Sequence, residues 1–335
     1  MTPRKKVTLK EIAVAANLAV PTVSQILNGK KNFCSEQKVK EVKQIAHDLG
    51  YVPNIGYRIM TGQETNTIGV MVSSSIAMQE YFIRAQVLKL LDGFSRKGCV
   101  AFCQVMEHAA AGAINIVRET LGRGATRLVF VGAPCGMEEI FDLLDKKHIP
   151  YISDTEICQR YVTFDAETAR IRLYNYLDRK TGGNFKICWP NDTYWRQNIL
   201  PHAAAPEYLA DKLVKITPQG NGSYYDNCFA AGYEFVKELT ARDPQLRGIA
   251  FPNDSYAHGA AMYLYENGRD DFYLAGCNGD SELRRFPYPV ATGFFDTGKI
   301  AELMVERSFD NGPCRLSVPV ELQIRGKAIP ENEYM

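Results

Sequence analysis

Short polar motifs follow several apolar segments of this 335-residue chain, and their side chains could hold a ligand or transfer protons. The motifs include Ser-Ser-Ser at 73–75, Ser153-Asp154, Pro-Asn-Asp at 252–254 and Cys-Asn-Gly-Asp at 277–280. Carboxylates and amides are the groups that bind ligand hydroxyls in such sites. An enzyme is the alternative interpretation, because Asp154, Asp254 and Asp280 could form a set of general acids and bases.

The apolar segments that end in these motifs are predicted to be strands alternating with helices. Strands are expected within 68–75, 99–105, 127–134, 149–154, 186–192, 213–219, 248–254 and 272–280, and helices at Phe82–Lys97, Ile114–Leu121 and Ala166–Leu177. This alternation predicts an α/β fold of doubly wound parallel sheets with helices on both faces. The number of units exceeds one comfortable sheet, so we expect two similar subdomains. Ligands bind at the carboxyl ends of such strands, so the motifs should face one another across a cleft.

The first fifty residues have a different pattern, with the period of helices. Two short amphipathic segments, Leu9–Ala16 and Val20–Leu27, flank a break at Asn17-Leu18. A third apolar face follows, formed by Val39, Val42, Ile45, Ala46 and Leu49. Two short helices joined by a tight turn and braced by a third predict a helix-turn-helix, whose second helix can enter a DNA major groove.

Charge is distributed unevenly along the chain. Residues 1–62 contain ten Lys and Arg against four acidic residues, a net charge of +6, whereas the remainder carries −5. A basic head on a mildly acidic body suits a head that binds a polyanion. A merely solvated basic surface is the alternative, which the helix-turn-helix pattern disfavours.

Cysteine usage and hydropathy indicate a cytoplasmic chain. The nine cysteines form no Cys-x-x-Cys pair, which fits a reducing compartment better than a disulfide framework or a zinc site. No apolar run approaches the ~20 residues of a membrane span. The basic start, Met-Thr-Pro-Arg-Lys-Lys-Val, lacks the apolar core of a signal peptide.

A linker is predicted between the head and the body. Pro53 disfavours helix at Val52 and so ends the third helix. Residues 54–61 could form two turns of helix, with Asn54 as the first cap and Gly62 as the stop. A helix this short is marginal alone in water, so it should be ordered only when something holds it.

With these features the sequence resembles the LacI/GalR family of bacterial transcription regulators over essentially its whole length. Residues 7–28 match the head motif of the family, and Tyr-Val-Pro-Asn at 51–54 matches its hinge. The body matches in order at 67–72, at 252–260, at 274–280 and at 319–328. The resemblance implies a homodimer that binds a pseudo-palindromic DNA operator and responds to a small molecule in the cleft of a periplasmic-binding-protein-like core.

The resemblance also implies the domain boundaries. The helix-turn-helix domain would span 1–53, and the hinge helix and linker 54–66. The effector-binding and dimerisation core would span 67–335. Within it, subdomain N would comprise about 67–160 and 293–322, and subdomain C about 161–292 and 323–335.

By the resemblance, Val20, Pro21 and Gln25 hold the positions that read base edges. Val20 and Pro21 could contact thymine methyls, and Gln25 could bond adenine, which favours an A·T-leaning half-site. Packing of Val20 and Pro21 within the head is the alternative. Phosphate contacts are implied for Thr8, Thr22, Ser24, Asn28, Lys30 and Lys31.

The hinge is the second implied DNA contact. Met60 stands where a leucine of the family wedges into the central base step of the minor groove. Asn54 and Arg58 would flank it, and Tyr57 replaces the usual alanine against the groove, which puts the insertion geometry in doubt. Met60 could alternatively pack between domains.

The implied effector pocket combines polar and aromatic residues. Its members are Ser73, Ser75, Tyr81, Phe82, Gln104, Asp154, Trp195, Arg196, Asn253, Asp254, Asn278, Asp280 and Phe295. Cys277, Asn278 and Phe295 depart from the family pattern, which predicts one wall more apolar than in a typical sugar site. Each aromatic residue could instead belong to the core.

Together these observations predict a sequence-specific DNA-binding transcriptional regulator, a repressor, controlled by a sugar or related metabolite. An architectural DNA-binding protein with a non-functional sensor core is the first alternative, and a solute-binding protein is the second. The chain has no P-loop and no G-x-G-x-x-G, H-E-x-x-H or G-x-S-x-G motif, so no enzyme, cofactor or metal is expected. The predicted location is the cytoplasm, associated with the nucleoid and not with a membrane.

Overall fold

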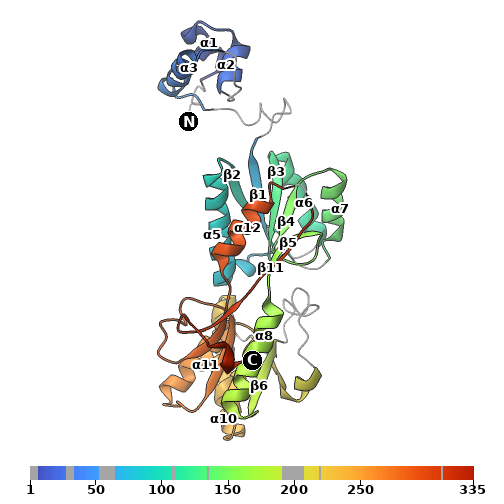
Figure 1. Ribbon diagram of the computed structural model, residues 1–335, viewed down its shortest axis with the longest axis vertical. Coiled ribbons are helices and arrows are strands. Elements are labelled where there is room, and N and C mark those ends of the chain that lie inside the picture. Colours follow the sequence, from blue (N-terminus) through green and yellow to red (C-terminus); the bar gives the residue numbers. More distant parts are fainter. Residues whose placement is uncertain are drawn as a thin grey trace. The chain divides into compact units, whose positions relative to one another are not determined.

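The structure is a computed structural model that describes residues 7–27, 34–52, 65–106, 110–133, 136–190, 207–218, 220–310 and 312–335. The chain divides into two compact units, Met1–Thr65 and Asn66–Met335. We call them the head and the core and describe each by itself (Figure 1).

The head contains three helices, α1 (Leu9–Ala16), α2 (Val20–Leu27) and α3 (Glu36–Asp48). Thr8 begins α1 with a capping box, in which its hydroxyl accepts from the Glu11 amide while the Glu11 carboxylate accepts from the Thr8 amide. Asn17 ends α1 in the left-handed region, at φ 52°, which turns the chain sharply toward α2. The predicted helix-turn-helix is therefore confirmed.

The head has its own small apolar core. Ile12, Val23 and Val42, one from each helix, are fully buried and pack together. They lie on the faces that the apolar spacing predicts, because residues three or four positions apart share one side of a helix. Burial of these side chains fixes the angle between α1 and α2.

The core contains two sheets. The first is six-stranded, in the order β11 (Cys314–Val318), β5 (Arg160–Phe164), β4 (Tyr151–Ser153), β3 (Ala125–Val131), β1 (Thr67–Val72) and β2 (Val100–Val105). All its strand pairs are parallel. Helices α5 (Tyr81–Arg96) and α12 (Thr297–Arg307) pack on one face, and α7 (Glu138–Lys146) on the other, with α6 (Ala110–Gly122) beside it.

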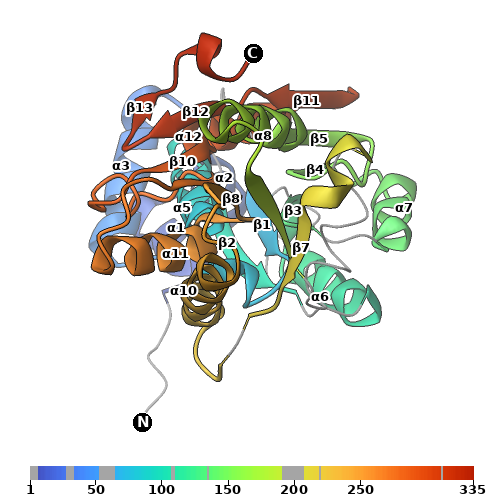
Figure 2. The same cartoon turned by 90° about the horizontal axis from the view of Figure 1, so that it is seen from below.

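The second sheet has seven strands. Their order is β13 (Lys327–Ala328), β12 (Glu321–Ile324), β10 (Val290–Phe294), β9 (Tyr273–Asn278), β8 (Gly248–Ala250), β6 (Phe185–Pro190) and β7 (Leu213–Ile216). Strands β12 and β13 join in antiparallel pairs, and the other pairs are parallel. Figure 2 shows α8 (Ala166–Thr181) on one side of this sheet, and α10 (Tyr224–Arg242) and α11 (Asp254–Glu266) on the other.

Helices α10 and α11 touch backbone to backbone. A Cβ atom at Gly232 would lie 2.0 Å from the carbonyl oxygen of Tyr256, and one at Gly259 would lie 1.9 Å from that of Phe229. Only glycine permits this approach, since any side chain would collide with main chain. The close crossing holds the start of α11, which carries Asn253 and Asp254, in a fixed position.

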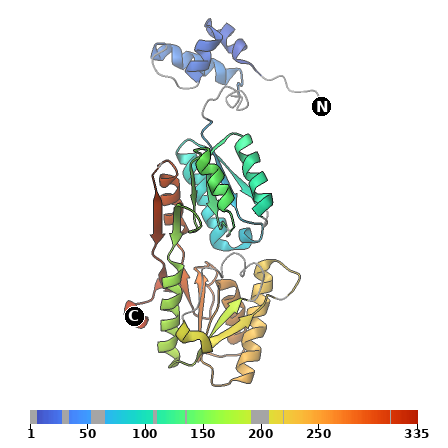
Figure 3. The same ribbon diagram turned by 90° about the vertical axis from the view of Figure 1, so that its right-hand side faces the viewer.

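The chain passes between the two sheets three times, after β5, after β10 and between β11 and β12 (Figure 3). Phe164 pairs with Val318 in the first sheet, whereas Phe294 pairs with Glu321 in the second. The predicted boundaries at about 160, 292 and 322 therefore need correction by a few residues. The strand ladders decide membership, since β5 continues to Phe164 in the first sheet, β10 continues to Phe294 in the second, and β12 of the second sheet already begins at Glu321.

The remaining short elements are the 3-10 turns η1 (Ala77–Gln79), η3 (Glu207–Lys212) and η4 (Glu331–Glu333). Within the described parts of the chain, no helix is long and apolar enough to cross a membrane.

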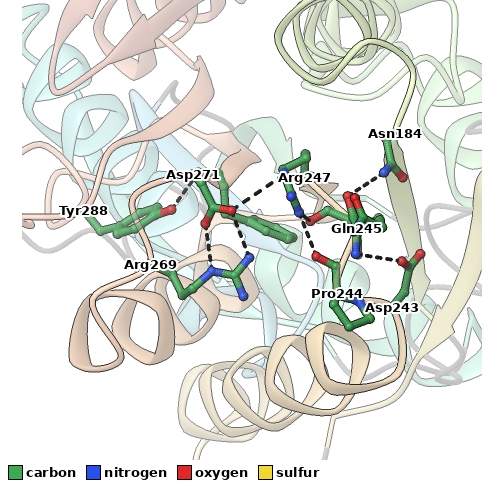
Figure 4. A network of polar contacts seen from close by, with 10 residues as sticks. Asn184, Asp243, Pro244, Gln245, Arg247, Arg269, Asp271 and Tyr288 are labelled. Carbon is green, nitrogen blue, oxygen red and sulfur yellow. Dashed lines mark hydrogen bonds and ion pairs between the residues drawn. The ribbon is translucent and has the colours of Figure 1, made fainter.

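The amino ends of the strands in the second sheet are joined by a surface network (Figure 4). The Asp271 carboxylate accepts from Arg269 Nε at 2.7 Å and lies 3.6 Å from Arg247 Nε. Arg247 also donates to the Pro244 carbonyl at 2.8 Å, and the Tyr288 hydroxyl donates to the Phe272 carbonyl at 2.6 Å. This network is remote from the carboxyl ends of the strands, where the polar motifs lie.

Candidate nucleic-acid interface and ligand-binding residues

The side of α2 turned away from the head core carries the residues predicted to read bases. Val23 and Ile26 are buried, whereas Val20 is 39% exposed and Pro21 is exposed. Gln25 follows Pro21 by one turn and is half-buried. A helix with its apolar stripe in the core and a free opposite side can enter a major groove.

The residues predicted to bind phosphates differ in their availability. The Thr8 hydroxyl is engaged in the capping box, since it also donates to Glu11 Oε2 at 3.0 Å. Thr22 and Ser24 are half-buried on α2. Asn28, Lys30 and Lys31 lie outside the described residues.

The predicted hinge also lies outside the described residues. This applies to the short helix and to its proposed minor-groove residues Asn54, Tyr57, Arg58 and Met60. Their roles remain predictions from the sequence.

In the core, two amide side chains converge on a carboxylate. Asn253 Nδ2 lies 3.3 Å from Glu80 Oε1, and Asn278 Nδ2 lies 3.2 Å from Glu80 Oε2. Asn253 caps α11, with its Oδ1 accepting from the amides of Ser255 and Tyr256, so its Nδ2 is left to face Glu80. Glu80 precedes α5, which packs on the first sheet, whereas Asn278 ends β9 of the second sheet and Asn253 caps α11, which packs on that sheet, so these bonds join the two subdomains.

The environment of Glu80 disfavours its charged form. Burial, together with the nearby Asp280 carboxylate, raises the pKa of Glu80 to about 7, whereas Arg84 and the bond from Asn278 oppose the change. A second contact joins the subdomains beside it, because the Tyr224 amide at the start of α10 donates to Gln79 Oε1.

Asp254 is buried and fixes the loop that follows β9. Its carboxylate accepts from the Asp280 amide at 2.7 Å and from the Thr292 hydroxyl at 2.8 Å and 2.9 Å. Burial raises the pKa of Asp254 well above its usual range and also raises that of Asp280. Asp254 therefore positions the loop that carries Asp280, and its own oxygens already have donors.

Asp154 lies in a similar buried setting in the first subdomain. It accepts from the Gly132 amide at 2.7 Å and from Gln86 Nε2 at 3.0 Å. Burial raises its pKa to about 7, against the effect of these two donors.

Ser73, at the end of β1, is 4% exposed, and its hydroxyl has no hydrogen-bond partner within the described residues.

Phe82 and Phe295 form an aromatic wall where the chain crosses between the sheets. Their rings meet edge to face with centroids 5.3 Å apart, and Phe295 stacks on Phe164 at 4.5 Å. Phe295 is 8% exposed. These rings contact one another, and their place in an effector pocket stays a prediction.

The other predicted pocket residues are not brought into this group by any described contact. Gln104 on β2 accepts from Arg123 at 3.4 Å, while Ser75 and Tyr81 are exposed. Trp195 and Arg196 lie outside the described residues. The sequence reasoning also missed Glu80 and Thr292, because neither stands in a polar motif at a predicted strand end.

The described residues contain no group of three or more His, Cys, Asp and Glu side chains that could hold a metal ion. The buried carboxylates are held by hydrogen-bond donors of the protein, which suits positioning and ligand binding.

Known proteins are similar to both the head and the core of this chain. Residues 8–54 match the family model described as bacterial regulatory proteins, lacI family. The HTH-type transcriptional regulator CelR of Thermobifida fusca is 32% identical, over 97% of this chain and 99% of the relative.

Two solved structures share the fold. A lac repressor dimer bound to operator and the anti-inducer ONPF has a TM-score of 0.73 at 16% identity, covering 96% of this chain and 99% of that chain. The periplasmic binding protein component of an arabinose ABC transporter from Shewanella sp. ANA-3 has a TM-score of 0.61 at 15% identity. It covers 77% of this chain and 92% of that chain, so the core has a periplasmic-binding-protein-like fold.

Proposed function

Because the chain belongs to the LacI family of bacterial regulatory proteins and is a DNA-binding transcription regulator, we propose that α2 reads its operator and that a small molecule bound in the core controls operator affinity. The observation that carries the first part is the free side of α2, on which Val20, Pro21 and Gln25 lie opposite buried Val23 and Ile26. Val20 and Pro21 would contact thymine methyls, and Gln25 would bond adenine.

We infer a homodimer acting as a repressor on a pseudo-palindromic operator, since a two-fold protein matches a two-fold site. The phosphate contacts from Thr22, Ser24, Asn28, Lys30 and Lys31 would fix the register without reading sequence. Thr8 would contribute through the start of α1, since its hydroxyl already serves the capping box. Asn54, Tyr57, Arg58 and Met60 would form the minor-groove contact.

Selection of bound sites from random duplex DNA by the purified full-length protein tests this proposal. We expect enrichment of a palindrome with half-sites about one helical turn apart. Enrichment of A·T content without a palindrome would instead support an architectural protein.

The effector is proposed to be a sugar or related metabolite, bound where the two subdomains meet. Asn253, Asn278 and Asp280 supply hydrogen-bonding groups there, and Phe82 and Phe295 supply an aromatic wall. The fold relative from Shewanella is bound to L-arabinofuranose in its solved structure, which supports a carbohydrate. Ser73, Ser75, Tyr81, Gln104, Asp154, Asp254, Trp195 and Arg196 complete the proposed set, of which Asp154 and Asp254 would act by positioning.

The protein would work in the cytoplasm, at the nucleoid, where its operator is found. No catalytic step is assigned to the buried carboxylates, since donors of the protein already satisfy Asp154 and Asp254. Turnover of a bound metabolite by the purified protein would contradict this assignment.

A further inference from the structure

A small cavity opens under α8 at the carboxyl ends of β6, β8 and β9. Its volume is about 20 Å³, and it is lined by one face of α8 and by the last residues of these three strands. A space of this size admits a single water-sized group. The same edge of the sheet carries Asn253 and Asn278, so the cavity adjoins the proposed effector residues.

Two side chains of α8 that can donate hydrogen bonds line this cavity. Arg170 and Tyr174 stand one helical turn apart on the same face, and no described residue makes a hydrogen bond or an ion pair with either side chain. Tyr174 is only 7% exposed, and Arg170 is half-buried. Both side chains line this cavity, so an acceptor bound there could take a hydrogen bond from each.

The surroundings of Arg170 suit an anion. The Arg170 cation lowers the pKa of both Tyr174 and Cys277, but burial dominates and raises each to about 12. Cys188, also in the lining, has its pKa raised well above the usual value by burial. Both thiols and the phenol are therefore neutral at physiological pH and would not repel a negative charge.

On the basis of the proposed function, we propose that this cavity receives one oxygen of an oxyanion group of the effector, a carboxylate or a phosphate, which binds Arg170 and Tyr174. The guanidinium would form a charge-assisted bond and the phenol a second bond to the same group. The cavity admits one oxygen atom of this group, so the rest of the group and of the molecule would extend toward Asn253 and Asn278. The effector is then an acidic derivative of a sugar or related metabolite.

The test uses acetate and inorganic phosphate as probes on the full-length protein. Thermal unfolding is measured with each salt against sodium chloride of equal ionic strength, and Trp189 in the cavity lining gives a fluorescence signal. We expect one or both anions to raise the melting temperature and change the fluorescence of the wild type. The effective probe distinguishes a carboxylate effector from a phosphate effector.

Variants make the result specific. Arg170→Gln should weaken binding of the probe by about tenfold or more, because a charge-assisted bond is lost. Tyr174→Phe should weaken it less, and Arg170→Lys should retain part of it. Arg179→Gln is the matched control, since Arg179 lies on the same helix and donates to the Asn332 carbonyl.

Equal anion effects in Arg170→Gln and Arg179→Gln would overturn the proposal, because salts also stabilise proteins non-specifically. No anion effect on the wild type would overturn it as well. Operator selection by Arg170→Gln keeps this proposal separate from the proposed function. If Arg170→Gln loses anion binding but still selects the same DNA site as the wild type, both the anion-site proposal and the proposed DNA-binding function are supported. If the wild type selects no DNA site, that result counts against the proposed DNA-binding function and leaves the anion-binding test unaffected.

Discussion

Gln25 is the residue of α2 with the chemistry to discriminate between bases, since its amide can donate to and accept from one adenine edge. We expect Gln25→Ala to relax specificity at one position of each half-site, at a cost of about 1–3 kcal/mol there. Binding of single-base operator variants measures this. A loss of equal size on all sequences would make Gln25 a phosphate contact instead, and Lys40→Ala, on exposed α3 surface, serves as the control.

Asp154 should make the free energy of unfolding of the core decrease as the pH rises, which is opposite in sign to ordinary acid denaturation. Burial raises its pKa to about 7 in the folded protein, so the folded state keeps a proton that the unfolded state has released. Stability should therefore fall as pH rises from about 4 to about 7. Glu80, with a pKa of about 7, contributes in the same direction.

Asp154→Asn should remove part of this slope and melt several degrees above the wild type at pH 8, at about 2–4 °C per kcal/mol. The Gln86 amide can turn to satisfy the new side chain, because its Oε1 is buried without a partner within the described residues. Thermal unfolding between pH 5 and pH 8 measures the slope, with exposed Asp178→Asn as the control. Parallel profiles for Asp154→Asn and the wild type would refute the assignment.

At the scale of elements, α2 begins without a side-chain cap. The Ala19 carbonyl accepts from the amides of Thr22 and Val23, but its methyl side chain accepts nothing. Ala19→Ser should stabilise α2 by about 1 kcal/mol. Hydrogen exchange of the α2 amides in the full chain should slow about fivefold, and Ala15→Ser, inside α1, should give no such protection.

The sequence predicted helices and strands correctly where a local pattern of apolar residues determines the type of element. The spacing of Ile12, Val23 and Val42 predicted the head, and the apolar runs predicted strands such as β1 and β9. β5, β11 and β12 had no isolated apolar run before a polar motif, and their sheet membership depends on pairing with segments far along the chain. Glu80 was missed for the same reason, since only the meeting of the two subdomains brings it to Asn253 and Asn278.

At the scale of the whole molecule, control of operator affinity requires that ligand and DNA favour different arrangements of the same core. The bonds from Asn253 and Asn278 to Glu80 close one arrangement without any ligand. A ligand that binds these amides must displace the Glu80 carboxylate or insert between them. In the proposed effector site, Glu80 would therefore compete with the effector for these two amides.

Glu80→Ala should consequently loosen the closed arrangement. Without the carboxylate, two amides face the junction unpaired, which favours their exposure to water. We expect a larger radius of gyration by small-angle X-ray scattering for the ligand-free variant, together with an altered affinity for operator but not for random DNA. Glu302→Ala is the control, because Glu302 lies on the exposed side of α12, where it pairs with Lys299.

Glu80→Gln separates charge from shape in this junction. Its side chain has one acceptor oxygen, so it can serve one of the two amides and must present its own donor to the other. An intermediate opening, between the wild type and Glu80→Ala, is the expected result. If Glu80→Gln and Glu80→Ala both scatter like the wild type, the closed arrangement depends on the Phe82–Phe295–Phe164 wall and not on the carboxylate.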